Sequence, residues 1–295
     1  MSEGHREQGV VVLGHGQIGL VTDDPLVDAS TFRRTMTGDS LISAVVAARE
    51  GLPTALVTRV GDDVYGSWLL EQWEEEGIHL DFVRQIPGSN PLELRSNAAS
   101  GQALMWRDGA APASMDASDV EGIPWDLMSV LYVPGSTQAL GAGPREATRY
   151  AMEAARAAGV QTVHAPLLRS GIWPTGAEVA ARAAFEEILP VTDVLVIEAP
   201  YSAGKLLGRA DAQEAARAAR DHGVRRVIVR QREKGCLLAE GNSFETVESP
   251  KAATSSPIFL GTLVARLAEG KPMREATENA LEAEAKNHFL WNFEQ

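Results

Sequence analysis

The chain has 295 residues, of which 44% are hydrophobic and 23% charged, and 27 basic against 40 acidic residues give a net charge of −13. This composition excludes a disordered or fibrous protein and predicts a soluble globular one. The acidic balance argues against nucleic-acid binding, which needs a basic face for the phosphates. Cys236 is the single cysteine, which excludes an intramolecular disulfide and a multi-cysteine zinc site. We expect a reducing, cytoplasmic compartment.

Residues 1–9 are polar and charged and contain no apolar segment behind a basic start, so no secretory signal is expected. No run of about 18 apolar residues follows, so no membrane-spanning segment is expected either. The sequence shows no internal repeat and no low-complexity linker. We therefore predict a single domain over residues 1–295.

Short apolar, β-branched runs alternate with helical segments along most of the chain. The first run, Val10–Leu13, is closed by Gly14 and Gly16, which is typical of a buried parallel strand. The Ala-rich helical segments 146–158 and 210–221 each end in a glycine just before the next apolar run. This order predicts βαβ units, hence a parallel sheet with helices on both faces. Further strands of this kind are predicted at residues 55–57, 130–133, 162–163, 194–197 and 226–229.

Two segments, residues 31–37 and 92–106, interrupt this alternation. They carry strand-forming residues with Gly and Asn between them, and no helix separates them. We predict antiparallel strands outside the main sheet that form a small lid within about residues 14–37 and 88–115. The last third of the chain is predicted to be helical at 260–269 and 273–289.

Several motifs resemble those of the ribokinase-like (PfkB) carbohydrate kinase family. The clearest is Arg59-Val-Gly-Asp-Asp-Val-Tyr-Gly, and upstream Thr37-Gly-Asp-Ser is similar to the family's Gly-Gly-Asp-x-x-Asn helix start. The resemblance covers nearly the whole chain and is closest to the fructokinase and 2-keto-3-deoxygluconate kinase branch. Matching segments follow in the family's order at Met105-Trp-Arg-Asp-Gly, Leu168-Arg-Ser-Gly, Asp193-Val-Leu-Val and Glu233-Lys-Gly-Cys.

The resemblance implies a three-layer α/β/α fold with a mostly parallel central sheet and a small β lid, through which the family often dimerises. It also implies transfer of the γ-phosphoryl group of Mg-ATP to a sugar hydroxyl, with an aspartate base in a Gly-Ala-Gly-Asp segment at a helix N-terminus. In this chain that segment falls on Thr254-Ser255-Ser256-Pro257. A proline side chain accepts no proton, so no catalytic residue is assigned.

Other family positions have also changed. Where the resemblance implies polar residues that contact sugar, magnesium or nucleotide, this chain has Gly19, Ile42, Ala165-Pro166-Leu167, Glu198-Ala-Pro-Tyr201, Arg230-Gln231-Arg232 and Lys251-Ala252.

The residues that survive favour a small polyhydroxy or carboxylate ligand, held by Asp39 and by the guanidinium groups of Arg107 and Arg169. As candidates for the substrate site we take Gly38, Asp39, Arg107, Arg169 and His164, a titratable newcomer beside an altered sugar position. His15 is a second histidine candidate. As candidates for a nucleotide or anion site we take Lys234, Gly235, Thr254, Ser255 and Ser256.

Each of these candidates also has a structural interpretation. Asp39 and Thr254-Ser255-Ser256 could simply begin helices, and either histidine could be structural. The arginines could form surface ion pairs, and no His, Asp or Glu grouping has metal-ligand spacing.

The main functional hypothesis is a pseudokinase that keeps a small-molecule pocket under the lid. The alternatives are a divergent but active sugar kinase using Mg-ATP, with Glu198 or another carboxylate as base, or a non-kinase enzyme using His164. A regulatory subunit is also possible on the sequence, because Ile42 and Leu167 are apolar replacements.

Overall fold

The structure is a computed structural model that describes residues 9–98, 101–168, 171–250 and 256–286. Its elements, in chain order, are β1 (Gly9–Leu13), β2 (Gln17–Thr22), β3 (Arg33–Thr37), α1 (Asp39–Arg49), β4 (Thr54–Gly61), α2 (Gly66–Glu75), β5 (Ile78–His79), β6 (Val83–Ile86), β7 (Leu92–Ser96), β8 (Ala103–Trp106), β9 (Met128–Pro134), α3 (Gly135–Gln138), α4 (Ala142–Ala157), β10 (Gln161–Ala165), α5 (Glu178–Ile188), β11 (Val194–Glu198), α6 (Tyr201–Leu207), α7 (Ala212–Asp221), β12 (Arg226–Arg230), β13 (Cys236–Glu240), β14 (Ser243–Val247), α8 (Ser256–Ala268) and α9 (Met273–Lys286). Short 3-10 turns occur between several of them.

The main sheet has the strand order β14-β13-β12-β11-β10-β9-β1-β4-β5, with β6 also paired to β4. Eight strands of this sheet run parallel to one another: β1, β4, β5, β6, β9, β10, β11 and β12. At one edge, β13 pairs antiparallel with β12, and β14 pairs antiparallel with β13. The expected parallel strands are confirmed. The sequence pattern did not predict the antiparallel pair that closes the edge.

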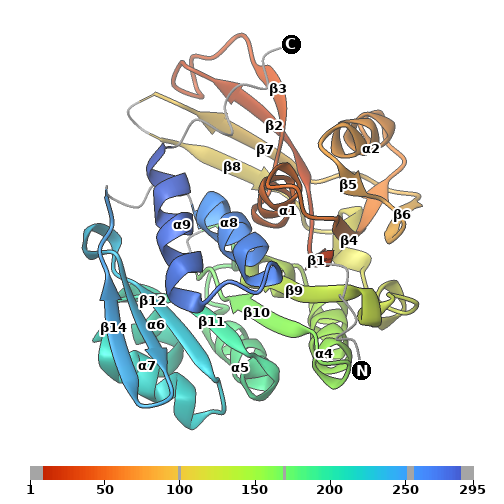
Figure 1. The fold of residues 1–295 in the computed structure, drawn as a ribbon. Helices are drawn as coiled ribbons and strands as arrows, with labels where there is room; N and C mark the ends of the chain where they lie inside the picture. Colours follow the sequence, from red (N-terminus) through yellow and green to blue (C-terminus); the bar gives the residue numbers. More distant parts are fainter. Residues whose placement is uncertain (1–8, 99–100, 169–170, 251–255, 287–295) are drawn as a thin grey trace.

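Helices cover both faces of this sheet, as Figure 1 shows. Every residue of β1 is buried, and its side chains alternate between two cores. Val10 and Val12 pack with α1 and α8 on one face, and Val11 and Leu13 pack with α4 on the other. A third cluster joins β11 and β12 to helices α5, α6 and α7. The predicted three-layer ribokinase-like fold is confirmed.

A second, four-stranded sheet with the order β3-β2-β7-β8 forms the lid, seen at the top of Figure 1. Its strands fall in the two stretches where lid strands were expected. The lid is not purely antiparallel, however, because β2 pairs with β7 in parallel. The prediction of antiparallel strands is therefore wrong at the centre of the lid. The expected division of the chain into one domain stays a prediction.

Helices α1 and α8 pack closely along the sheet through Gly261 of α8. A Cβ atom added at Gly261 would lie 2.6 Å from the Ser43 carbonyl oxygen and 2.6 Å from Val46 Cβ. At one end of the contact, Ser43 Oγ donates a hydrogen bond to the Pro257 carbonyl over 3.1 Å. At the other end, Arg266 pairs with Glu50. The two helices therefore run parallel, with their N-termini at the same end of the sheet.

None of the helices within the described residues is both long and apolar enough to cross a membrane.

Substituting Gly261→Ala is expected to destabilise the protein by about 1–3 kcal/mol, because the new methyl group must push α1 and α8 apart. The matched control is Gly204→Ala in α6, where the added Cβ would lie 3.8 Å from its nearest neighbour, Ala210 Cβ. We expect the free energy of unfolding of that control to exceed that of the wild type by about 1 kcal/mol or less, since alanine favours a helix more than glycine does. Urea unfolding of both variants is the measurement, and equal midpoints would contradict the close α1–α8 contact.

Candidate functional site

Three connections meet beyond the carboxyl ends of the central strands. Residues 14–16 leave β1, Gly38 precedes α1, and α3 follows β9 directly. Thr137 Oγ1 of α3 donates to the Leu13 carbonyl oxygen over 2.9 Å. A Cβ atom at Gly14 would collide with Ser40 Oγ and with Thr137 Oγ1. The segments are thus in close contact with one another, at the edge where parallel α/β sheets bind ligands.

Gly38 and Asp39 begin helix α1 at this junction. Gly38 is the N-cap and has φ of 118°, which a residue with a side chain rarely adopts. A Cβ atom there would lie 2.8 Å from the His15 carbonyl oxygen. Asp39 follows, half-buried, in the first turn of the helix. The glycine is therefore required by the close approach of the β1 connection, and it places the Asp39 carboxylate beside that connection.

Arg107 follows the last lid strand, β8, and only 8% of it is exposed. Its Nη2 donates to the Gly171 carbonyl oxygen over 3.1 Å. Burial lowers the pKa of the guanidinium, and the carboxylates of Asp108 and Asp39 oppose this shift. The structure therefore brings Arg107 and Asp39 within electrostatic range of each other, as the predicted substrate site requires.

His15 lies at the same junction, in the segment that leaves β1, and is 3% exposed. Burial lowers its pKa to about 4, helped by the charge of Arg107 and opposed by Asp39 and the Gln17 side chain. Its ring is therefore neutral at pH 7. Within the described residues, its buried Nδ1 has no hydrogen-bond partner.

Gln17 and Glu93 form a buried polar pair on the lid that the sequence analysis missed. Gln17 Nε2 of β2 donates to Glu93 Oε2 of β7 over 2.7 Å, and Arg95 Nε donates to Glu93 Oε1 over 2.8 Å. Gln17 and Glu93 are 3% and 4% exposed. The segment Leu92-Glu-Leu alternates as a half-exposed strand does, so no signal in it distinguishes a buried glutamate from a solvated one.

His164, the other histidine proposed for the substrate site, is packed between β10 and α5. It is fully buried in β10, where its Nδ1 donates to the Val133 carbonyl oxygen over 2.7 Å. Its ring is 6.1 Å from that of Phe185 on α5. Burial lowers its pKa to about 4. His164 thus belongs to the layer between the sheet and α5, as the structural interpretation of a strand histidine expects.

The expected nucleotide side lies near the end of β12 and the start of α8. Arg230 Nη2 donates to both carboxylate oxygens of Glu284 on α9, over 2.9 and 2.6 Å, and Nη1 donates to Ser256 Oγ over 3.1 Å. The guanidinium also lies 4.3 Å from the centre of the Phe259 ring. Arg230 and Glu284 are 8% and 2% exposed. An internal ion pair therefore ties β12, α8 and α9 together here.

The other candidates on this side have structural roles or lie outside the described residues. Pro257 occupies the first turn of α8, where proline fits a helix start, and it presents only its carbonyl group. Lys234 is exposed, and Gly235, with φ of 81°, makes the tight turn into β13. Glu198, at the end of β11, pairs with Arg232 over 3.0 Å. Outside the described residues lie Arg169, Thr254 and Ser255.

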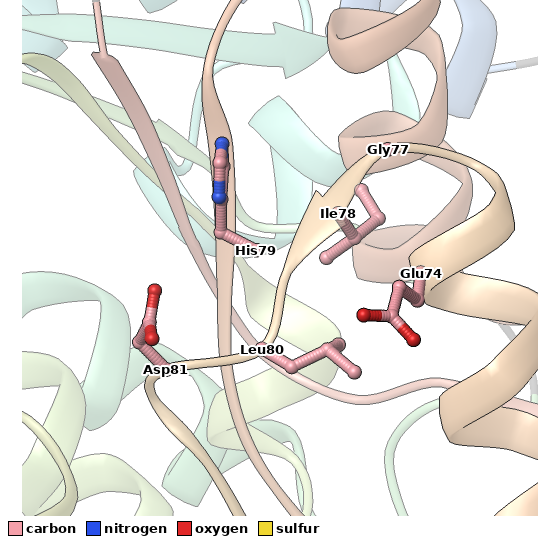
Figure 2. Close-up of a pocket in the computed structure, with 6 residues that line it drawn as sticks. All are labelled: Glu74, Gly77, Ile78, His79, Leu80 and Asp81. Atoms are coloured by element: carbon pink, nitrogen blue, oxygen red, sulfur yellow. The ribbon is translucent and has the colours of Figure 1, made fainter.

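A shallow depression of about 520 Å³ lies elsewhere, at the edge strand β5. Figure 2 shows its lining, which comes from the end of α2 and from β5 and the residues after it. Ile78 and Leu80 point toward α2, whereas His79 points to the other side of the strand. No candidate site residue of the sequence analysis lines this depression, and none of its lining residues belongs to the junction at β1. The described residues also contain no cluster of three metal-ligating side chains.

Known proteins resemble this chain in sequence and in structure. The sequence model described as "pfkB family carbohydrate kinase" matches residues 8–283. A relative from Thermoproteus tenax named 2-dehydro-3-deoxygluconokinase is 27% identical over 283 residues, which covers 90% of this chain and 85% of the relative.

Solved structures share the fold. A PfkB protein from Polaromonas sp. JS666 superposes with a TM-score of 0.86 at 23% identity, covering 94% of each chain. A putative Ribokinase II from E. coli, in complex with ATP and Mg2+, superposes with a TM-score of 0.80 at 17% identity, covering 94% of this chain and 95% of the other.

The two buried histidines predict a pH-dependent stability. The folded pKa of His15 and of His164 is about 4, against 6.5 for an ordinary histidine. The unfolded chain therefore binds more protons at pH 5, and the free energy of unfolding falls as the pH drops from 6.5 toward 4. We expect each histidine to remove roughly 2 kcal/mol between pH 7 and pH 5.

The His164→Asn variant, whose amide can still donate to the Val133 carbonyl, is expected to lose about half of the histidine contribution to this pH dependence. Urea unfolding at the two pH values measures it. The control is His79→Ala, an exposed position that should leave the pH dependence unchanged. An unaltered pH dependence in His164→Asn would contradict the assigned buried, neutral state.

Proposed function

Because the chain belongs to the pfkB family of carbohydrate kinases, we propose that it is a sugar-binding member that has lost phosphoryl transfer from ATP. The observation that carries this proposal is the first turn of α8. Pro257 stands there in place of the carboxylate base, and the neighbouring Ser256 hydroxyl accepts a hydrogen bond from Arg230. A hydroxyl group of a bound sugar would find no proton acceptor at this turn.

The Arg230–Glu284 ion pair supports the same proposal. An incoming phosphate would meet the negative charge of Glu284 and would have to take Arg230 from it. Removing one partner from a buried ion pair costs about 3–5 kcal/mol. Nucleotide binding with a Kd of about 1 mM releases only about 4 kcal/mol. The Arg230–Glu284 pair therefore supports the proposal that Mg-ATP does not bind in this arrangement.

The sugar side, by contrast, keeps a set of groups suited to a polyhydroxy ligand. The Asp39 carboxylate can accept hydrogen bonds from hydroxyl groups, and the Arg107 guanidinium can hold a carboxylate. Both groups lie close enough to His15 to change its pKa, which supports a shared site. We propose a sugar or a sugar acid as the ligand.

A second candidate is an active sugar kinase, and the comparisons taken alone favour it. The relative from Thermoproteus tenax is named as a kinase, and the E. coli structural neighbour is described in complex with ATP and Mg2+. Mg-ATP would supply the phosphoryl group. Glu198 of β11, which lies opposite Arg230 of β12 in the parallel pairing, would supply the carboxylate. That carboxylate would first have to leave Arg232. Both candidates use the same sugar site.

Calorimetric titration separates the two candidates. We expect no heat from Mg-ATP up to millimolar concentration, and binding of at least one compound from a panel of 2-dehydro-3-deoxygluconate, gluconate and fructose. Arg107→Leu is expected to weaken binding of the two acids about tenfold or more, because a charge-assisted contact is lost. ATP-dependent phosphorylation of any panel compound would overturn the proposed loss of activity. A panel that does not bind at all would overturn the sugar-binding proposal.

We further propose a homodimer formed through the lid. Leu104 and Trp106 of β8 are 51% and 52% exposed and face the same way as Leu94 and Leu92 on β7. A second copy of the chain would cover this apolar strip. Sedimentation velocity is expected to show a dimer for the wild type and a monomer for Leu104→Glu. A monomeric wild type would refute the proposal.

A further inference from the structure

We infer that Asn90 and the motif at residues 59–66 are positioning elements that hold both ends of the lid hairpin β7–β8 on the main sheet and so set the place of Arg107. This motif is the clearest one in the sequence, and the proposed function makes no use of it. The inference deepens the proposed function and rests on it only for the part that Arg107 plays in ligand binding.

Asn90 lies just before β7, and its side chain is bound to the last residue of β4. Its Oδ1 accepts a hydrogen bond from Gly61 N over 3.0 Å, and its Nδ2 donates to the Gly61 carbonyl oxygen over 3.0 Å. Only 8% of Asn90 is exposed. The side-chain amide therefore pairs with both backbone groups of one β4 residue, as a neighbouring strand would.

Asp63 fixes the orientation of this amide. Asp63 Oδ1 accepts from Asn90 Nδ2 over 2.7 Å and from Tyr65 N over 3.0 Å, and Asp63 Oδ2 accepts from Asn90 N over 2.7 Å. Hydrogen bonds to a carboxylate are about twice as strong as those between neutral groups. Both N–H groups and the oxygen of the Asn90 amide thus have partners. We call Gly61, Asp63 and Asn90 the clamp.

The glycines of the motif allow the chain to come close enough for the clamp to form. A Cβ atom at Gly61 would lie 2.4 Å from the Gly88 carbonyl oxygen, and one at Gly66 would lie 2.1 Å from the Gly61 carbonyl oxygen. Asp62 Oδ1 also accepts from Gly88 N over 3.0 Å. The end of β4 and the segment before β7 are therefore in contact along several residues.

The other end of the hairpin is held at the same place. After β8, Ala111 N donates to the carbonyl oxygen of Ser89, the residue before Asn90, over 2.9 Å. Further along, the Arg59 guanidinium of β4 donates to Asp119 Oδ1 over 3.0 Å and to Asp116 Oδ2 over 2.9 Å. The chain therefore leaves the main sheet for the hairpin and returns from it beside the same strand, β4.

Arg107 lies between these points of attachment. It follows β8 directly, and its carbonyl oxygen accepts from Ala110 N over 3.1 Å, one residue before the contact of Ala111. Its guanidinium donates to the Gly171 carbonyl oxygen over 3.1 Å. A short connection with fixed ends leaves the arginine little freedom, and groups that are held in place in advance bind ligands more tightly. Loss of the clamp is therefore expected to displace Arg107.

Hydrogen exchange followed by mass spectrometry tests the hold on the hairpin. In Asn90→Ala, the amide groups of β7, β8, Ala110 and Ala111 are expected to exchange about tenfold faster, and those of β9 to β11 at the wild-type rate. Asn90→Asp has the same side-chain size but brings a second carboxylate to Asp63, so we expect the same increase. The matched control is Asn97→Ala, an exposed asparagine just after β7. Wild-type exchange in Asn90→Ala would overturn the inference.

A double-mutant cycle tests the positioning of Arg107, with the panel acid that binds tightest as the probe. In the wild type, Arg107→Leu is expected to weaken binding of this acid about tenfold. In the Asn90→Ala background the same substitution is expected to weaken it less than about threefold, because the arginine is already displaced. If the clamp served stability alone, the tenfold effect would persist, and the inference would be overturned.

The inference and the proposed function fail in different ways. If no panel compound binds to the wild type, the proposed function is overturned, and exchange at Ala110 and Ala111 still decides whether the clamp holds the backbone of Arg107. If Asn90→Ala does not fold, the unsubstituted protein gives the answer. Its Gly61 and Asn90 amide groups should exchange as slowly as those of β9, and fast exchange there would overturn the inference.

Discussion

The contact between α1 and α8 across Gly261 is the constraint on which both halves of the site depend. It sets the two helices parallel, with the start of each at the carboxyl end of the sheet. Helix α1 begins with Asp39 and helix α8 with Ser256 and Pro257. Because the helices touch through a glycine, neither start can shift along the other without breaking the contact. The first turns of α1 and α8 therefore lie side by side in this fold, whatever side chains they carry.

At the start of α8, polar and charged groups are paired within the protein. Proline suits the first turn of a helix, and a buried arginine with a carboxylate partner ties three elements together. In an active phosphotransferase this region must stay open to a highly charged ligand, which costs stability. Once that requirement is removed, the same positions can take residues that close the region. The Arg230–Glu284 pair and Pro257 are the residues on which our proposal of lost phosphoryl transfer depends.

The sequence predicted the parallel strands well, because runs such as Val10–Leu13 are buried on both faces and read as continuous apolar segments. The sequence did not predict strand pairing between segments far apart in the chain, such as the parallel pairing of β2 with β7.

The two histidines show the limit of prediction for the site. His15 and His164 each follow an apolar run, and only the fold separates a connection facing the lid from a strand interior facing α5. Gln17 and Glu93 gave no signal, since they are brought together only by the pairing of β2 with β7.

The charged groups near α8 and the polar groups near α1 differ in their partners. Near α8, the guanidinium nitrogens Nη1 and Nη2 of Arg230 and both carboxylate oxygens of Glu284 have partners within the protein. Near α1, polar atoms of His15 and Gln17 are buried and have none among the described residues. Buried polar atoms are retained without partners mainly where something else satisfies them. The internal Arg230–Glu284 pair near α8 is the reason why we propose ligand binding on the sugar side and not on the nucleotide side.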